Sequence, residues 1–521
     1  MSDELSDADQ QQDAGNEIGH EIGENNIQTY GLDIHNPVFA ISAVLAVTFV
    51  IGTLLFREAA TQLFGDMRVW ITTTFDWFFM ISANLFVILC FVVAFSKLGR
   101  VRLGGEGAKP QYTDPAWLAM LFAAGVGIGL MFFGVLEPVT HTLNPPLSID
   151  PEDVATARAA GMSSAIFHWG LHAWAIYAVV GLSLAFFSFN QGMPLTLRSA
   201  FYPLFGKAVW GPLGHLVDIL AVLATLFGLA TSLGLGAGQI AGGLNYLFDL
   251  PADITTKIIL IGLIISIALA SVVAGLDKGV KRLSELNMAM AAGLLLFVFL
   301  VGPTIAILGG AVQATIDYAY YLPQLSNWVG RSDAAFLHGW TTFYWAWWIA
   351  WSPFVGMFIA RVSYGRTVRE FIVWVLIIPT IIGILWMSTF GGTALDQLIN
   401  DGYRGVADAV PELALFKMLE GLPLTTLVSG ISIFLIGLFF VTSADSGSLV
   451  VDTITAGGKM DAPIRQRVFW CVLTGLVAIA LMVGGGIASL QALTISVGLP
   501  FCVVLLVMCA GLVKGLIAEK P

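Results

Sequence analysis

Two clusters of aromatic residues are the groups in this chain best suited to bind a cation. The clusters are Trp169, Trp174 and Tyr177, and a run from 343 to 351 that holds Trp345, Trp347, Trp348 and Trp351. At about 100° per residue along a helix, Trp174 and Tyr177 share one face, as do Trp348 and Trp351. Aromatic faces attract a quaternary ammonium or sulfonium group without any buried anion. Two facing clusters would therefore form a cation box, with bulky packing as the alternative.

Glycine occupies every second position within another apolar stretch, at Gly125, Gly127 and Gly129. Gly125 and Gly129 have the spacing of close helix packing. The other interpretation is an interrupted helix at the membrane midplane, because glycine lets the backbone leave helical geometry. Freed carbonyl groups would then coordinate a cation, and freed N–H groups would face an anionic group of a substrate. Pro353, two residues after the second aromatic cluster, is a second candidate for a helix break.

Two neighbouring hydroxyl groups, those of Thr442 and Ser443, lie in a third apolar stretch shortly after Phe439. Hydroxyls in membrane helices often bond back to the preceding turn. Hydroxyl and carbonyl oxygens are also suitable ligands for a hard cation. Asp445 in the same stretch is a candidate functional charge, with a structural partner on a neighbouring helix as the alternative.

Other chemistry is not indicated. The sequence contains no P-loop and no soluble domain large enough for an ATPase, so any transport energy must come from ion gradients. We expect no metal-ligand cluster, because the seven histidines are scattered and only His168 and His172 share a helix face. For that pair, hydrogen bonding to neighbouring helices is the main interpretation, and a proton relay or metal site is the alternative. The four cysteines show no pairing or metal spacing.

The elements that position these groups must be membrane helices. Of the 521 residues, 57% are hydrophobic and 11% charged, against roughly 45 to 50% and about 25% in soluble proteins. A soluble globule is excluded, and an all-α polytopic membrane protein is expected. Apolar stretches of about 20 residues predict twelve transmembrane helices. They cover residues 37–56, 76–96, 115–136, 164–187, 216–247, 257–276, 286–309, 341–360, 371–391, 424–455, 468–484 and 489–513.

The charges predict how these helices are oriented. Of the 24 Lys and Arg residues, seventeen fall in the even-numbered connections and the C-terminal tail, and seven in the odd-numbered connections. This asymmetry places both termini in the cytoplasm. Residues 1–35 hold nine acidic residues and no Lys or Arg, which predicts a disordered acidic cytoplasmic tail. Residues 514–521 form a short cytoplasmic tail, and the external segments 137–163 and 310–340 could hold amphipathic surface helices.

The combined motifs closely resemble the betaine/choline/carnitine transporter family over residues 36–513. The resemblance is carried by residues 125–138, by 167–177, by the tryptophan-rich stretch 340–361 and by Thr442-Ser443-Ala444-Asp445. It implies a leucine-transporter-like fold of 5+5 inverted repeats preceded by two extra helices. Spans three to seven, about 115–309, and spans eight to twelve, about 341–513, would be the repeats. It also implies a homotrimer in a prokaryotic cytoplasmic (inner) membrane.

The resemblance also implies roles for individual residues. The methylated cation of the substrate would lie among Trp169, Trp174, Tyr177 and Trp348, with Trp347 and Trp351 along the path. Gly125, Gly127 and Gly129 would supply backbone groups at the substrate. Sodium would bind the carbonyls of Ala123, Val126 and Phe439 and the hydroxyls of Thr442 and Ser443.

Three departures from the family pattern refine these expectations. Choline-type relatives carry Asp at the position of Gly129, so this chain is expected to prefer a zwitterion. The second sodium site of sodium-coupled relatives uses two hydroxyls one helical turn apart. Thr225 matches the first, but Leu229 occupies the second position, so dependence on one sodium ion rather than two is expected. The chain ends eight residues after Val513, so activation by a long basic C-terminal helix is not expected.

The function expected from the sequence is a sodium-coupled symporter that imports glycine betaine or a similar zwitterion such as dimethylsulfoniopropionate. Alternatives are a proton-coupled or exchange carrier for choline or carnitine and, more remotely, a membrane-embedded enzyme, for which no nucleophile or metal spacing is visible. A channel is disfavoured because no filter motif is present. The expected partners are this small methylated zwitterion, the sodium ion, the lipid membrane and further copies of the chain; no cofactor and no nucleic acid are expected.

Overall fold

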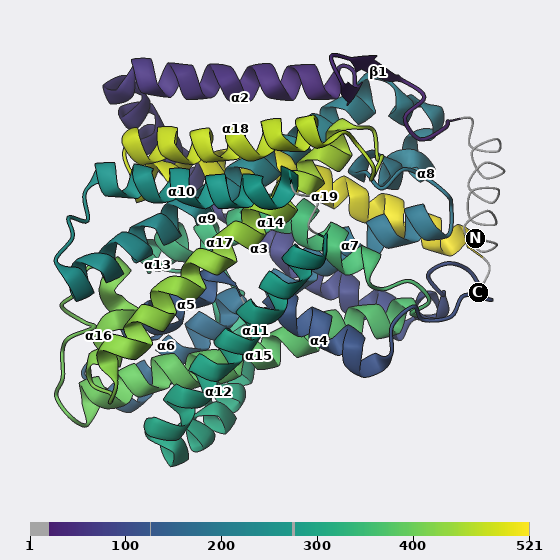
Figure 1. The fold of residues 1–521 in the computed structure, drawn as a ribbon. Helices are drawn as coiled ribbons and strands as arrows, with labels where there is room; N and C mark the ends of the chain where they lie inside the picture. The colour runs from purple at the N-terminus through teal and green to yellow at the C-terminus, as the bar shows by residue number, and fades with distance from the viewer. Residues whose placement is uncertain (1–19, 126, 274–276, 520–521) are drawn as a thin grey trace.

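The computed structural model describes residues 20–125, 127–273 and 277–519, which form a bundle of long helices and one small β-hairpin (Figure 1). Ten helical stretches in this part of the chain are long and apolar enough to cross a membrane. They are α2 (Val38–Leu55), α3 (Arg57–Phe95), α6 with α7 (Val154–Phe189), α9 (Pro212–Phe248), α10 (Ile254–Val273), residues 282–301 of α11 (Asp277–Val301), α15 (Val368–Ile399), α17 (Thr425–Thr455), α18 (Ile464–Val483) and α19 (Ile487–Ala518).

The third predicted span is interrupted at its glycines. Helix α4 (Asp114–Gly125) ends there, and α5 (Ile128–Leu143) begins after Gly127, whose backbone is extended with φ −153° and ψ −176°. The prediction of a helix break, rather than plain glycine packing, is therefore confirmed. Each half is too short to count among the ten long helices.

The eighth predicted span corresponds to α14 (Thr342–Arg361). This helix is not among the ten stretches, because its tryptophans and tyrosine lower its mean hydropathy. Pro353 was a second candidate for a helix break, and this prediction was wrong, because α14 continues through it. Proline lacks the N–H that would reach the carbonyl of Ile349. The Ser352 hydroxyl donates to that carbonyl instead, at 2.7 Å.

A break that the sequence analysis missed lies within the fourth span. Helix α6 (Val154–Trp169) ends at Gly170, which has φ −101° and ψ −135°, and α7 (Leu171–Phe189) begins immediately after it. A Cβ atom at Gly170 would lie 2.7 Å from the carbonyl oxygen of Ile166. This approach to the preceding turn is tighter than a side chain allows.

The seventh span ends earlier than predicted. Helix α11 stops at Val301, and α12 (Thr304–Leu325) begins after Pro303 as a separate helix. One face of α12 is apolar and exposed, at Ile305, Leu308, Val312, Ile316 and Tyr320. The short elements are η1 (Lys97–Arg100), η2 (Leu197–Phe201), α8 (Tyr202–Phe205), η3 (Gly206–Trp210), α13 (Ala334–Phe336), η4 (Leu337–Thr341), η5 (Pro411–Leu413) and α16 (Ala414–Glu420).

The hairpin lies in the segment that was predicted to be disordered. Strands β1 (Asn26–Thr29) and β2 (Leu32–His35) pair antiparallel. The Asn26 amide donates to the Ala456 carbonyl at 2.9 Å, and Lys459 donates to Asp33 at 2.6 Å. The prediction of disorder was thus wrong for residues 26–35, because bonds to the connection between α17 and α18 hold them; residues 1–19 lie outside the described residues.

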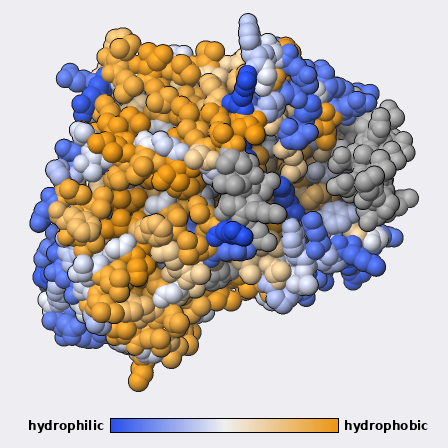
Figure 2. Space-filling view, in the orientation of Figure 1, coloured by the Kyte–Doolittle hydropathy of each residue, from blue (hydrophilic) through white to orange (hydrophobic). Residues whose placement is uncertain are grey.

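The packing places α14 in the interior, where it contacts α7, α9 and α19. Both aromatic clusters are therefore enclosed by helices. On the outer surface, hydrophobic residues cover a broad continuous area of the face shown in Figure 2, and hydrophilic residues gather at its left and right ends. The hairpin and the end of α19 lie at the same end of the molecule (Figure 1).

Candidate functional site

The two aromatic clusters face one interior cavity of about 80 Å³. Eight of the predicted substrate-binding residues line it: Trp169, Trp174, Tyr177, Trp347, Trp348, Trp351, Gly127 and Gly129. Helix α9 adds Ser232 to the wall, and α15 adds Pro379 and Gly383. Gly125, the remaining predicted residue, is the last residue of α4.

Trp348 lies at the centre of the ring arrangement. Its ring centroid is 4.8 Å from that of Trp169 and 6.0 Å from that of Tyr177, and both pairs meet edge to face at 75°. Trp347 stacks on Trp348 at 5.1 Å, and Trp174 meets Tyr177 at 5.3 Å. These five side chains are all buried, so the cavity wall is formed by aromatic rings inside the helix bundle.

The break at Gly170 helps to orient two of these indoles. Because α6 ends at Trp169, the carbonyls of its last turn have no partner within the helix. The His168 carbonyl accepts the Trp348 indole N–H at 2.8 Å, and the Trp169 carbonyl accepts the Trp174 indole N–H at 3.2 Å. The break thus leaves two backbone carbonyls free to accept the hydrogen bonds that orient Trp348 and Trp174 in the cavity wall.

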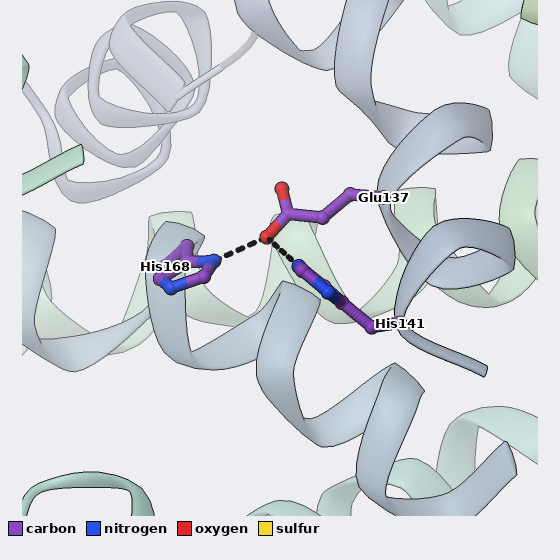
Figure 3. Close-up of side chains that lie close together, drawn as sticks. All are labelled: Glu137, His141 and His168. Atoms are coloured by element: carbon purple, nitrogen blue, oxygen red, sulfur yellow. Dashed lines mark hydrogen bonds and ion pairs between the residues drawn. The ribbon is translucent and has the colours of Figure 1, made fainter. Parts of the chain in front are cut away.

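A buried carboxylate, Glu137 of α5, lies behind this wall. Its Oε2 accepts the Trp169 indole N–H at 2.9 Å and the Tyr344 hydroxyl at 2.6 Å. Its Oε1 is bonded to Nδ1 of His168 and lies 3.4 Å from Nε2 of His141. Figure 3 shows His141 and His168 converging on this one oxygen of Glu137. No role for Glu137 was predicted from the sequence; the one local feature that points to this cluster is the spacing of four residues between Glu137 and His141.

Glu137, His141 and His168 also have the donor types and proximity of a metal site, because one ligand atom from each lies within 4.8 Å of the others. The expectation that the chain holds no metal-ligand cluster was therefore wrong, because the fold brings His168 close to Glu137 and His141. Position 168 is 31 residues from 137, and only the packing of α6 on α5 brings the two together. In the structure His168 Nδ1 bonds to Glu137, His141 Nε2 approaches the same oxygen at 3.4 Å without a hydrogen bond, and His168 Nε2 bonds to the Thr341 hydroxyl at 3.0 Å.

Four of the five residues predicted to bind sodium lie within the described part of the chain. Ala123 lies in α4 and Val126 lies outside the described residues, while Phe439, Thr442 and Ser443 lie in α17, which contacts α5. The Thr442 hydroxyl lies 3.0 Å from the carbonyl oxygens of both Leu438 and Phe439, in the preceding turn. The side chain of Ser443 is half-buried.

Three other polar residues singled out in the sequence have structural partners. Asp445 accepts from Arg467 of α18 at 2.5 Å and from Ser271 of α10 at 3.3 Å. His172 Nε2 is 2.9 Å from the Asn84 amide oxygen of α3, and His168 bonds to Glu137 and Thr341. The interpretation of the histidine pair as hydrogen-bonding residues between helices is confirmed.

Two of the departures from the family pattern have a direct structural context. A Cβ atom at Gly129 would lie 2.2 Å from the Trp169 ring, so no side chain fits there unless Trp169 moves. Leu229 is buried, and its side chain packs against Gly447 of α17, where an added Cβ would be 2.3 Å away. The Thr225 hydroxyl donates within α9, to the Ala221 carbonyl at 2.8 Å.

Comparison with known proteins agrees with the family resemblance. Residues 37–521 match the sequence model of a family described as BCCT, betaine/carnitine/choline family transporter. A glycine betaine/proline/choline transporter of Vibrio parahaemolyticus is 54% identical over 519 residues, which cover 96% of this chain and 94% of the relative. From the same organism, glycine betaine transporter 1 is 50% identical, with 96% and 97% covered. A glycine betaine/proline/choline/ectoine transporter is also 50% identical, with 96% and 90% covered.

Proposed function

Because the chain belongs to the betaine/carnitine/choline transporter family, we propose that it imports a methylated zwitterion together with sodium by alternating access. The chain is a multi-pass membrane transporter and not an enzyme. Glycine betaine or dimethylsulfoniopropionate is the proposed type of substrate. The names of three close relatives include glycine betaine, which supports this choice.

The observation that carries the proposal is the aromatic cavity. Trp169, Trp174, Tyr177 and Trp348 offer ring faces on several sides of one enclosed space. Such faces attract a methylated cation by cation–π interaction. An enclosed apolar wall disfavours hydrated ions of similar size, because they would lose their water without new hydrogen bonds.

The carboxylate of the zwitterion has a matching position at the start of α5. Gly127 caps this helix without any side-chain hydrogen bond, and Gly127 and Gly129 both line the cavity. The first N–H groups of a helix lack partners within the helix and favour an anion. We propose that the break in the third span presents these groups to the substrate carboxylate.

We propose twelve membrane spans, in which the broken helix α4–α5 and the aromatic helix α14 add to the ten long stretches. Spans three to seven and eight to twelve would form inverted repeats, after two peripheral helices α2 and α3. The distribution of Lys and Arg supports cytoplasmic termini in a prokaryotic inner membrane. A homotrimer is proposed from the family resemblance, and the exposed apolar face of α12 offers a surface for it.

Sodium coupling is proposed at the carbonyls of Ala123, Val126 and Phe439 and the hydroxyls of Thr442 and Ser443. The interrupted third span and the contact of α17 with α5 support it. A proton-coupled or exchange carrier for choline or carnitine is the second candidate. The presence of choline in the names of two relatives favours keeping choline as a substrate to be tested.

The test is uptake by purified protein in proteoliposomes with a panel of radiolabelled substrates. We expect glycine betaine accumulation that requires an inward sodium gradient and exceeds choline accumulation. Undiminished uptake in sodium-free potassium buffer at fixed pH and voltage would mean that protons or exchange drive the carrier. Stronger transport of choline than of glycine betaine would overturn the assigned substrate class.

A further inference from the structure

Glu137 is fully buried and is not among the residues that line the cavity, yet it bonds to one that does, Trp169. We propose that Glu137 is a positioning residue for the methylated cation. It fixes the Trp169 indole in the cavity wall and makes that ring more attractive to positive charge. This inference rests on the proposed function, because it concerns how the same cavity selects its substrate.

The positional part follows from the hydrogen bond. The indole N–H is the single donor of a tryptophan side chain, and in Trp169 it points at Glu137 Oε2 from 2.9 Å. The opposite edge of the ring packs against Gly129, where a Cβ atom would lie 2.2 Å from it, so the ring fills the space that the missing side chain leaves. The bond to Glu137 is the polar contact that fixes the other edge of the ring. The carboxylate therefore holds the edge-to-face contact of Trp169 with Trp348 at 4.8 Å.

The electrostatic part follows from the charge of the acceptor. A hydrogen bond to an ionised group is stronger than a neutral one, and it polarises the donor more in a medium of low dielectric constant. Electron density in the indole then shifts toward its faces, which is the feature that attracts a cation. The negative charge lies at the N–H edge of the ring, and Glu137 does not line the cavity, so it does not meet the carboxylate of a zwitterionic substrate directly.

The remaining contacts of Glu137 fit this role better than a metal centre. Tyr344 shares Oε2 with Trp169, and His168 bonds Oε1 directly. A metal ion would have to separate Oε1 from the His168 nitrogen, and His168 is held from its other side by Thr341. The donors thus complete a hydrogen-bond network that keeps the carboxylate, and through it Trp169, in one place.

The experiment compares two ligands of nearly equal shape. Glycine betaine carries a trimethylammonium group, and 3,3-dimethylbutanoate carries an uncharged tert-butyl group in its place. Their affinities are measured on the full-length protein by competition against radiolabelled glycine betaine. The variants are Glu137→Gln, which keeps the shape, and Glu412→Gln, a matched control at a carboxylate near Lys257 and outside the cavity lining.

We expect Glu137→Gln to lower the preference for glycine betaine over 3,3-dimethylbutanoate by at least about threefold. Glu412→Gln should leave the preference unchanged. Equal weakening of both ligands, or no weakening, would show that Glu137 only supports packing and would overturn the inference. If wild-type protein binds no glycine betaine, the proposed function fails instead, so the two failures are distinguishable.

A second variant tests the same idea without changing Glu137. Replacing Trp169 by 3-benzothienylalanine keeps the size of the ring system but puts sulfur where the N–H was. We expect the preference for glycine betaine to fall here as well, although the carboxylate remains. An unchanged preference would rule out the link through Trp169, and this measurement also decides the question if Glu137→Gln does not fold.

Discussion

At the scale of single residues, the side chains that form the cavity wall were predictable from their chemistry. A methylated cation needs ring faces, and tryptophan inside a membrane span is unusual enough to indicate them. What the sequence could not supply is the orientation of each ring. That depends on Glu137 and on the carbonyls of His168 and Trp169, whose bonds to the indole N–H groups arise from helix packing and from the break at Gly170.

Trp348 should contribute to substrate affinity more than to folding. Trp348→Leu removes the ring at the centre of the box, and a cation–π contact is worth roughly 0.5 to 2 kcal/mol. We expect substrate binding to weaken by about 2- to 30-fold in isothermal titration calorimetry. Trp374→Leu is the control, because Trp374 on α15 is 38% exposed on the outer surface. A folded Trp348→Leu protein with unaltered affinity would argue against the aromatic box.

Gly129 should exclude choline by lacking a charge, but its substitution also disturbs Trp169. A side chain at 129 must displace the ring that lies 2.2 Å from the Cβ position. Gly129→Asp and Gly129→Asn share this steric cost and differ in charge. We expect both to lose glycine betaine affinity, and the ratio of choline to betaine affinity to be at least about tenfold higher in the Asp variant. Equal ratios would show that shape, and not charge, selects the substrate.

At the scale of elements, the helix breaks show where sequence reasoning succeeds and where it fails. Three alternating glycines predicted the break between α4 and α5 correctly. Pro353 suggested another, but the Ser352 hydroxyl satisfies the carbonyl that proline leaves free. The break at Gly170 was missed, because one glycine among apolar residues looks like any packed glycine. Side-chain hydroxyls and close approaches between turns decide such cases, and both need the structure.

The hydroxyls of α17 should govern sodium affinity more than substrate affinity. Thr442→Ala with Ser443→Ala removes two oxygen ligands. Among the described residues, the Thr442 hydroxyl bonds to the preceding turn of α17 and, at 3.5 Å, to Asn287. Folding should therefore be nearly unchanged. We expect the sodium concentration for half-maximal uptake to rise steeply, while substrate affinity at saturating sodium falls less.

Thr453→Ala is a suitable control for that variant, because its hydroxyl also bonds back within α17, to the Leu449 carbonyl at 2.9 Å. It should leave sodium dependence unchanged. In the wild type, linkage requires that substrate tighten sodium binding by the same factor that sodium tightens substrate binding. Retained sodium dependence in the double Ala variant would show that the sodium site lies elsewhere in the protein.

At the scale of the whole molecule, composition and hydropathy predicted a helical membrane protein, because the bilayer admits few alternatives. Contacts between residues that lie far apart in the sequence could not be predicted from it. The cluster of Glu137 with His168 is one case, and the hairpin is another. Residues 26–35 belong to the acidic segment 1–35 that was predicted to be disordered, yet Arg465 donates to the Tyr30 carbonyl and the Gln466 side chain accepts from the Asp33 N–H. The hairpin is thus held in place by residues more than 400 positions away in the sequence.

The docking of this hairpin should depend on pH. His35 is buried, and burial, followed by the nearby charge of Arg198 and by His215 and His20, lowers its pKa from 6.5 to about 3. Burial also lowers the pKa of His20, which stacks on Trp210 at 4.1 Å. A histidine with a lowered pKa binds fewer protons docked than undocked, so docking is strongest above pH 6.5 and weakens toward pH 3.

This prediction can be measured with a spin label on Tyr30→Cys, at a position that is 92% exposed, with the half-buried Cys509 replaced by Ala. Each pKa unit corresponds to about 1.4 kcal/mol, so His35 alone should weaken docking by up to about 2 kcal/mol between pH 6.5 and pH 5. We expect an immobile label at pH 8 and a growing mobile fraction at pH 5. His35→Gln should reduce that change, because glutamine does not titrate. An equally immobile label at both values would show that neither histidine controls the hairpin, and that its hydrogen bonds to the connection between α17 and α18 suffice to hold it.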